Sequence, residues 1–356
     1  MLQISCGGLP REIGLEHGRK AAALIQGSVS FYSKHFMETS KMDWETACAT
    51  ASKFLPFLEQ QVPDLVEEMQ GIADGSGVPF ESILALNVRT EIAMGLMNDG
   101  CTSVAWCSDK FSVAGQNWDW MDAQKDRLVI LHIKSASRHG TTKPAISTIT
   151  EAGIVGKIGL NSAGVAVFLN AIFAKGVNYN KLPVHIALRS ALETRSRADA
   201  VALLESQGVA AASHILVAGD GATSLEFSAT GSTRADTSDG YLGHTNHYVR
   251  EHDGEDLIKM KDSVPRMGRV SELMDEAAIT VKQSPDTSPI TILENVLKDE
   301  RDFPVSINRQ SADDNPASTL FTIWVDLKAK TATVKLGRPT EPEGTWTLAP
   351  VEEWRK

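Results

Sequence analysis

The dipeptide Gly100-Cys101 combines a permissive backbone position with a nucleophilic side chain. Gly100 ends a turn signal that begins at Asn98, and glycine accepts backbone geometries that a Cβ atom would block. A cysteine directly after such a turn is expected to have an exposed sulfur within reach of the preceding carbonyl. Attack of the Cys101 sulfur on the Gly100 carbonyl carbon would form a thioester, and water would then release a new chain that begins at Cys101. The dipeptide therefore predicts a self-cleaving precursor.

The new terminus would unite the two parts of a catalytic unit in one residue. Cys101 supplies the thiol, and its freed α-amine has an unperturbed pKa of about 7.7 to 8.0, which suits a general base near neutral pH. A simpler interpretation stands beside this one. A single cysteine after a turn, at the start of an apolar strand, is ordinarily an inert buried thiol. The dipeptide alone does not choose between the two.

Three further polar residues could complete a site around this thiol. A hairpin is predicted after Cys101, so Asp119 would lie beside it and could orient the α-amine through a charge-assisted hydrogen bond. Asn246, within His-Thr-Asn-His, could donate its amide to a tetrahedral oxyanion. Arg309 could pair with a substrate carboxylate through its planar fork. The alternatives are a plain turn aspartate, a solvated loop and a surface arginine.

Other kinds of site find little support in the sequence. Neither Cys-x-x-Cys nor His-Glu-x-x-His occurs, and the side chains of His244 and His247 would face opposite sides of a strand, so we expect no metal ion and no bound cofactor. Residues 153–157 lack the spacing of a phosphate-binding loop. The Gly-x-Ser-x-Gly nucleophile motif is also missing.

Composition limits the class of protein. The 356 residues are 42% hydrophobic and 22% charged, which indicates a globular chain with one large domain plus an accessory segment, or two domains. The net charge of −10 argues against nucleic acid or an anionic membrane as a partner. Four scattered cysteines favour a reducing compartment. With no secretory signal, membrane-spanning run or peroxisomal C-terminal tripeptide, we expect a soluble cytoplasmic protein.

The elements that must position these residues change in character near position 100. Before it, the apolar spacing predicts an α-rich region after a short strand at 2–4. Helices are predicted to begin at Pro10, Trp44, Pro63 and Phe80, the second interrupted at Pro56 and the fourth ending at Met94. We expect Gly27 to end the first helix, and Gly75 and Gly77 to close the third.

After Cys101 short β-rich runs alternate with helical blocks. Strands are predicted at 101–107, 111–118, 128–135, 145–150, 158–173 as a hairpin turning at 161–164, 214–218, 224–227, 320–326 and 331–335. Helices are predicted at 183–193, 197–207, 265–278 and 290–298, and residues 253–262 are the nearest to a loose segment. This order favours a layered sandwich over a parallel α/β sheet.

With these segments in view, the chain resembles the isopenicillin N acyltransferase family, also called acyl-coenzyme A:6-aminopenicillanic acid acyltransferases, of the N-terminal-nucleophile hydrolase superfamily. The resemblance is nearly full length, and its segments include Asp99-Gly-Cys-Thr, Gly115-Gln-Asn-Trp-Asp, Asn161-Ser-Ala-Gly-Val-Ala-Val and His244-Thr-Asn-His. It implies an α+β fold, a four-layer αββα sandwich with an α-rich N-terminal region. It also implies cleavage between Gly100 and Cys101 into a helical segment, 1–100, and a catalytic region, 101–356, that stay associated.

The resemblance further implies roles for the candidate residues. Cys101 would be the acylated nucleophile and Asn246 the oxyanion-hole asparagine, while Asp119 and Arg309 would surround the nucleophile and the substrate. Asn170 lies where the related bile-salt hydrolases keep a second active-site asparagine. The thiol would accept an acyl group from isopenicillin N or from acyl-coenzyme A, a co-substrate rather than a cofactor. It would pass the group to 6-aminopenicillanic acid, as in penicillin biosynthesis, or to water.

The substrate stays open at this point. Trp120 and Met121 stand where the family has an aromatic pair that lines the acyl pocket. The alternative function is that of a paralogue that hydrolyses N-acyl amino acids or amides without a penicillin role, and a rival of another class is an unprocessed, inactive binding protein. The expected partners of an enzyme are a small acyl donor, an amine acceptor and its own N-terminal fragment, with no nucleic acid and no membrane.

Overall fold

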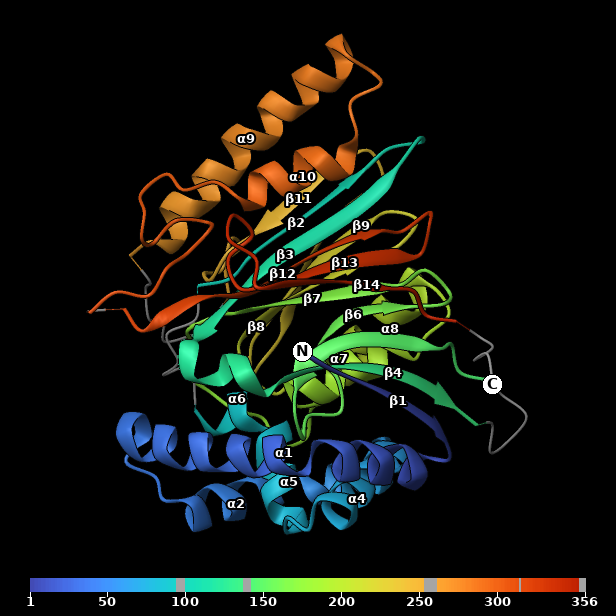
Figure 1. Ribbon diagram of the computed structural model, residues 1–356, viewed down its shortest axis with the longest axis vertical. Coiled ribbons are helices and arrows are strands. Elements are labelled where there is room, and N and C mark those ends of the chain that lie inside the picture. Colours follow the sequence, from blue (N-terminus) through green and yellow to red (C-terminus); the bar gives the residue numbers. More distant parts are fainter. Residues whose placement is uncertain (94–99, 137–141, 253–260, 314, 352–356) are drawn as a thin grey trace.

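Two β-sheets lie face to face, and helices cover both outer faces (Figure 1). The computed structural model describes residues 1–93, 100–136, 142–252, 261–313 and 315–351. Its layers run helix, sheet, sheet, helix, so the predicted α+β class with four αββα layers is confirmed. Within the described ranges no helix has the length and apolar character needed to span a bilayer.

The first sheet has the strand order β1-β4-β5-β6-β7-β8-β9-β10. Its strands are β1 (Leu2–Gly8), β4 (Leu128–Ser135), β5 (Ile146–Glu151), β6 (Ile158–Asn161), β7 (Ala166–Ala171), β8 (Ser213–Ala218), β9 (Ala222–Phe227) and β10 (Ser232–Thr237). β1 pairs in parallel with β4, and the other neighbours are antiparallel. The chain before Cys101 therefore supplies one strand of this sheet.

The second sheet has the strand order β11-β2-β3-β12-β13-β14, and all its pairs are antiparallel. Its strands are β2 (Thr102–Cys107), β3 (Ser112–Met121), β11 (Gly240–His244), β12 (Ala317–Asp326), β13 (Thr331–Leu336) and β14 (Gly344–Leu348). β2 and β3 lie inside this sheet, and every residue of β2 is buried. The sheet therefore holds the segment after Cys101 in the middle of the sandwich.

The helices form one layer on each side (Figure 1). The layer on the first sheet contains α1 (Pro10–Ser40), α2 (Trp44–Ser52), α3 (Leu55–Gln61), α4 (Pro63–Ser76), α5 (Phe80–Asn87), α6 (Arg89–Ile92), α7 (Val184–Leu192) and α8 (Arg197–Gln207). The layer on the second sheet contains α9 (Ser263–Gln283) and α10 (Pro289–Leu297), and a 3-10 helix, η1 (Asp122–Arg127), follows β3. Figure 1 shows α9 and α10 at one end of the stack and α1, α2, α4 and α5 at the other.

Several predicted boundaries differ from those observed. The helix from Pro10 does not end at Gly27 but continues to Ser40, since its buried face carries on through Tyr32 and Phe36. Gly75 lies inside α4, and only Gly77, with φ of 71°, closes that helix. The predicted fourth helix divides into α5 and α6, and its predicted end at Met94 lies outside the described residues.

The strands β10, β11 and β14 were not predicted. β10 reads Ser-Thr-Arg-Ala-Asp-Thr, and its side chains alternate between exposed and half-buried positions. β11 and β14 are also only half-covered along most of their length. These strands lie at sheet edges, where neighbouring backbones rather than an apolar face define the strand.

The crossing of α1 and α4 yields a testable prediction about stability. A Cβ atom on Gly14 would lie 1.9 Å from the Glu68 carbonyl oxygen, and one on Gly71 would lie 2.2 Å from the Arg11 carbonyl oxygen. Two backbones cannot separate locally, so we expect Gly14→Ala to lower the free energy of unfolding by about 2 kcal/mol or more. Urea denaturation would measure this change.

The matched control is Gly268→Ala in α9, where nothing beyond the adjoining backbone of the helix itself lies within 4 Å of the added Cβ. Alanine is the better helix former, so this variant should gain about 1 kcal/mol. Equal stability of Gly14→Ala and the unchanged protein would contradict the close crossing of the two backbones.

Candidate active site

Cys101 immediately precedes β2 and lies beside the end of β3. The register pairs Thr102 with Asn117, and the Cys101 Sγ atom is 3.9 Å from the Asp119 carbonyl oxygen. The predicted hairpin thus brings Asp119 back to the cysteine. The expectation of an exposed sulfur is wrong for this continuous chain, because an interior strand covered on both faces buries Cys101 completely.

The guanidinium group of Arg309 covers Gly100. A Cβ atom at position 100 would lie 2.2 Å from the Arg309 Nε atom, so the approach requires glycine. The same Nε atom is 3.3 Å from the Asp119 carboxylate, and Arg309 Nη2 pairs with Asp262. Arg309 is 2% exposed, so it is not the surface arginine of the alternative interpretation.

Asp119 is fixed from two sides. Its Oδ1 atom accepts a hydrogen bond of 2.7 Å from the Thr319 hydroxyl, while its Oδ2 atom faces Arg309. The same hydroxyl accepts a hydrogen bond of 3.1 Å from the Arg309 backbone N–H. The strand β12, which carries Thr319, therefore ties the aspartate to the arginine.

Arg266, in the first turn of α9, connects the cysteine to Asn246. Its Nη1 atom donates to the Cys101 carbonyl oxygen at 2.9 Å and to the Thr102 hydroxyl at 3.1 Å. Its Nη2 atom donates to Asn246 Oδ1 at 2.9 Å, and its Nε atom donates to Asp262 at 2.9 Å. One buried arginine therefore contacts both the cysteine backbone and the candidate oxyanion residue.

Asn246 lies two residues beyond the end of β11 and is buried, which excludes the solvated-loop alternative. Its Nδ2 atom donates to the Ala171 carbonyl oxygen at 2.9 Å. Its backbone N–H donates to the Ser263 hydroxyl at 2.8 Å. The amide is thus held between the end of β7 and the start of α9.

Asn170 is on β7, in the other sheet, and contacts the strand that follows Cys101. Its Oδ1 atom accepts a hydrogen bond of 2.6 Å from the Ser103 hydroxyl and lies 3.0 Å from His214 Nδ1. Its Nδ2 atom donates to the His244 carbonyl oxygen at 3.2 Å. Asn170 therefore spans the two sheets next to the residues that follow Cys101.

Two arginines and two aspartates alternate through this site, so their formal charges balance. Burial alone would raise the pKa of the Asp262 carboxyl, but the guanidinium groups of Arg266 and Arg309 lower it below its ordinary value. Burial lowers the pKa of Arg266, and Asp262 opposes that shift. Such a buried chain of charges holds its members in fixed positions, because each would be costly to leave unpaired.

All the candidate residues lie in one region. Gly100, Cys101, Asp119 and Arg309 are in direct contact, Asn246 is connected through Arg266, and Asn170 is connected through Ser103. Arg266, Asp262 and Thr319 were not found from the sequence.

One signal in the sequence could have identified Arg266. It occupies the buried stripe of α9 with Val270 and Met274, at helical spacing, where an arginine is out of place. Asp262 gave no such signal, because it ends the segment that was interpreted as loose. Of that segment, 253–260 lie outside the described residues.

Ala171, which accepts a hydrogen bond from the Asn246 amide, also lines a small hollow at the end of β7. The hollow is lined by Leu169, Ala171, Ile172, Phe173, Ala174, Ala211 and Ala212, with Arg89, Thr90 and Ser213. Ala171 is the residue whose carbonyl holds the Asn246 amide. Trp120 packs against Arg89, whose guanidinium lies 5.2 Å from its ring centroid. The hollow therefore adjoins the residue whose carbonyl oxygen holds the candidate oxyanion amide.

Glu91, a buried residue of α6, should make the stability of the fold depend on pH. Burial raises its pKa to about 7, against a hydrogen bond of 2.8 Å from the Val184 N–H. A raised pKa stabilises the fold at low pH, and this contribution is lost as the pH rises through about 7. Glu91→Gln mimics the protonated acid, so we expect its melting temperature to exceed that of the unchanged protein at pH 8 but not at pH 5. The prediction would be wrong if the melting temperatures of Glu91→Gln and the unchanged protein differed by the same amount at pH 5 and pH 8.

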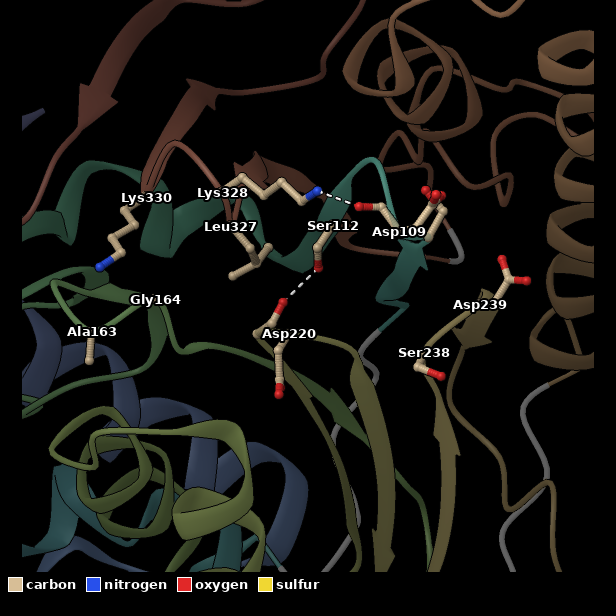
Figure 2. A pocket seen from close by; sticks show the side chains of 12 residues that line it. Asp109, Ser112, Ala163, Gly164, Asp220, Ser238, Asp239, Leu327, Lys328 and Lys330 are labelled. Atoms are coloured by element: carbon tan, nitrogen blue, oxygen red, sulfur yellow. Dashed lines mark hydrogen bonds between the residues drawn. The ribbon is translucent and has the colours of Figure 1, made fainter.

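A wide hollow of about 760 Å³ lies at the opposite end of the sandwich, among the hairpin tips. Figure 2 shows Asp109, Asp220, Lys328 and Lys330 around it, with Lys328 donating to the Asp109 carbonyl oxygen at 2.7 Å. Cys101 precedes β2 and Asp109 follows it, so about 20 Å of strand separates them. This hollow is not part of the cysteine site.

A metal centre finds no support in the described ranges, where no three His, Cys, Asp or Glu side chains cluster as metal ligands. Cys101 itself lies among hydrogen-bond donors and paired charges.

Comparisons with known proteins show the family to which the chain belongs. The model of the family described as acyl-coenzyme A:6-aminopenicillanic acid acyl-transferase matches residues 106–341. The 40 kDa form of acyl-coenzyme A:6-aminopenicillanic-acid-acyltransferase from Emericella nidulans is 36% identical over 98% of this chain and 96% of its own length. The β-alanyl-dopamine/carcinine hydrolase of Drosophila melanogaster is 22% identical over 58% of this chain and 57% of its own length.

Two solved structures are also similar. A mutant of the conjugated bile acid hydrolase from Clostridium perfringens is 13% identical, with a TM-score of 0.49 over 70% of this chain and 92% of that chain. Penicillin V acylase from Agrobacterium tumefaciens is 12% identical, with a TM-score of 0.44 over 70% of this chain and 86% of that chain.

Proposed function

Because the chain belongs to the acyl-coenzyme A:6-aminopenicillanic acid acyl-transferase family, we propose that it is an acyltransferase with amidohydrolase activity and that Cys101 is its nucleophile. The single observation that supports this assignment most is the enclosure of the Gly100-Cys101 segment. Arg309 lies on Gly100, and Arg266 holds the carbonyl of Cys101. A structural cysteine in a strand would need neither contact.

The first reaction in this proposal is self-cleavage. The Cys101 sulfur attacks the Gly100 carbonyl carbon, the carbon–nitrogen bond breaks, and the thiol proton ends on the released α-amine. Water then adds to the thioester, which frees the Gly100 carboxyl group and restores the thiol. Glycine at position 100 lets the Arg309 guanidinium group lie close to the cleavage site, because a Cβ atom there would collide with it.

The second reaction is acyl transfer by the mature chain. The α-amine of Cys101 takes the thiol proton, and the thiolate attacks the carbonyl carbon of the acyl donor. Hydrogen bonds from Asn246 stabilise the oxyanion, and the amine returns the proton to the leaving group. The acceptor amine, or water, then attacks the thioester and regenerates the thiol. Asp119, paired with Arg309, orients the α-amine.

The N-terminal fragment remains bound in this scheme. β1 pairs with β4 over seven residues from Leu2 to Gly8, and the buried core includes side chains from both sides of position 100. Residues 1–100 and 101–356 would therefore form two subunits that share one sandwich.

The proposed acyl donors are acyl-coenzyme A and isopenicillin N, with 6-aminopenicillanic acid as the acceptor. A second candidate is the hydrolysis of N-acyl amides without a penicillin role, which the similarity to a β-alanyl-dopamine/carcinine hydrolase favours. Comparing turnover of acyl-coenzyme A plus 6-aminopenicillanic acid with turnover of simple N-acyl amides separates the two.

The mass of the freshly purified protein under denaturing conditions tests self-cleavage. In proportion to 38.5 kDa for 356 residues, a break after Gly100 gives fragments of about 11 and about 28 kDa. We expect these two masses, with the larger fragment beginning at Cys101. A single 38.5 kDa species after long incubation would overturn the proposal and favour an inactive binding protein.

A further inference from the structure

Every nitrogen of the Arg266 guanidinium group is used within the site. Nε contacts Asp262, Nη1 contacts the Cys101 carbonyl oxygen and Nη2 contacts Asn246 Oδ1, each at 2.9 Å. The side chain is 3% exposed, although it stands on the same face of α9 as Val270. A buried arginine on an apolar stripe is costly, so a role beyond packing is indicated.

The planar fork of Arg266 determines which way the Asn246 amide points. A guanidinium group has five N–H donors and no acceptor, so the atom that faces Nη2 must be the amide oxygen. The other end of the amide faces the Ala171 carbonyl, which can only accept. The Ala171 carbonyl accepts a hydrogen bond from one of the two N–H bonds of Asn246 Nδ2. The second N–H is on the same amino group, so its direction is fixed as well.

We propose that Arg266 is a positioning residue that fixes the Asn246 amide relative to Cys101. Through one rigid group it connects the carbonyl of the nucleophile to the residue that stabilises the oxyanion. This inference rests on the proposed function. The contact of Arg266 with the Cys101 carbonyl becomes more important after cleavage, because Cys101 then loses its covalent connection to Gly100. The β2 ladder and Arg266 hold the new terminus from its carbonyl side.

Asp262 extends this arrangement to the other half of the site. It accepts from Arg266 Nε and pairs with Arg309, which contacts Asp119. The donor that orients the oxyanion residue and the pair that orients the α-amine are thus joined through one carboxylate. The two arginines cannot drift apart without leaving a buried aspartate unpaired.

A double-mutant cycle on the full-length chain tests the proposal. Arg266→Met should lower kcat for acyl transfer by about 100-fold and change KM by less than about threefold, measured per cleaved chain. In an Asn246→Ala background the same change should cost less than about tenfold, because Arg266 then has no amide to orient. Arg266→Lys, which keeps the charge without the fork, should lose nearly as much as Arg266→Met.

The matched control is Arg269→Met on the same helix. Arg269 pairs with Asp299 at 2.7 Å and with Glu272 at 3.1 Å, away from Cys101, so kcat should stay within about twofold. Equal losses in the two Asn246 backgrounds, or full activity of Arg266→Lys, would overturn the positioning role. Arg266→Lys also covers the case in which Arg266→Met does not fold. Activity retained by Cys101→Ala would instead overturn the proposed function.

Discussion

Cys101→Ala is expected to leave the chain as a single uncut species and to lower acyl transfer by about four to six orders of magnitude. The change removes only a sulfur atom from a fully buried position, so the fold should persist. The mass of the denatured protein and the rate of product formation measure the two effects.

Cys107→Ala is the control for this prediction. Cys107 lies on the same strand, β2, and is also buried, but it stands at the far end beside Ser112. Burial raises the pKa of its thiol, which suits an inert side chain. This variant should be cleaved and active to nearly the normal extent. Cleavage of the Cys101→Ala chain between Gly100 and Cys101 would show that the sulfur is not the attacking group.

Cys101→Ser separates position from chemistry. The hydroxyl occupies nearly the same space, but its far higher pKa makes it a poorer nucleophile. Slow cleavage, with an intermediate rate of acyl transfer, would place the attack at the side chain of residue 101. It would also show that the surrounding contacts can act on an oxygen.

The sequence predicted those helices and strands whose pattern is contained within a few neighbouring residues. The bounds of β4 and α8 were predicted as observed, because a dense β-branched run and an N-cap pair, Ser196 with Asp199, are local features. The edge strand β10 has no apolar face and was missed. Local periodicity thus defined elements that bury one face, but not those held mainly by neighbouring backbones.

In the candidate site, too, only contacts between segments close in the sequence could be predicted. Cys101 and Asp119 could be placed together because a hairpin joins them. The contact of Arg309 with Asp262 spans 47 positions and depends on how the loop before β12 meets α9, which no local pattern encodes. The polar cluster around Asn246 suggested an oxyanion role but left a solvated loop as the alternative, and the role of Asn170 came only from the family resemblance. Their proximity is a property of the tertiary structure.

Asn246→Ala is expected to lower kcat for acyl transfer by about 100- to 1000-fold, with a small change in KM. The amide N–H strengthens its hydrogen bond as negative charge develops on the oxygen, so its loss affects the transition state more than substrate binding. Steady-state kinetics of the cleaved enzyme measure the change. Self-cleavage should also slow, because it passes through an oxyanion of the same kind.

Asn246→Asp distinguishes catalysis from folding. The carboxylate has the shape of the amide and can accept from Arg266 Nη2 as the amide oxygen does. A new buried ion pair replaces that hydrogen bond, so the fold should be retained, although the carboxylate now opposes the Ala171 carbonyl oxygen. An ionised carboxylate has no N–H to donate, and its charge repels the oxyanion, so kcat should fall at least as far as in Asn246→Ala. A folded Asn246→Asp enzyme with normal kcat would exclude the amide as the oxyanion donor.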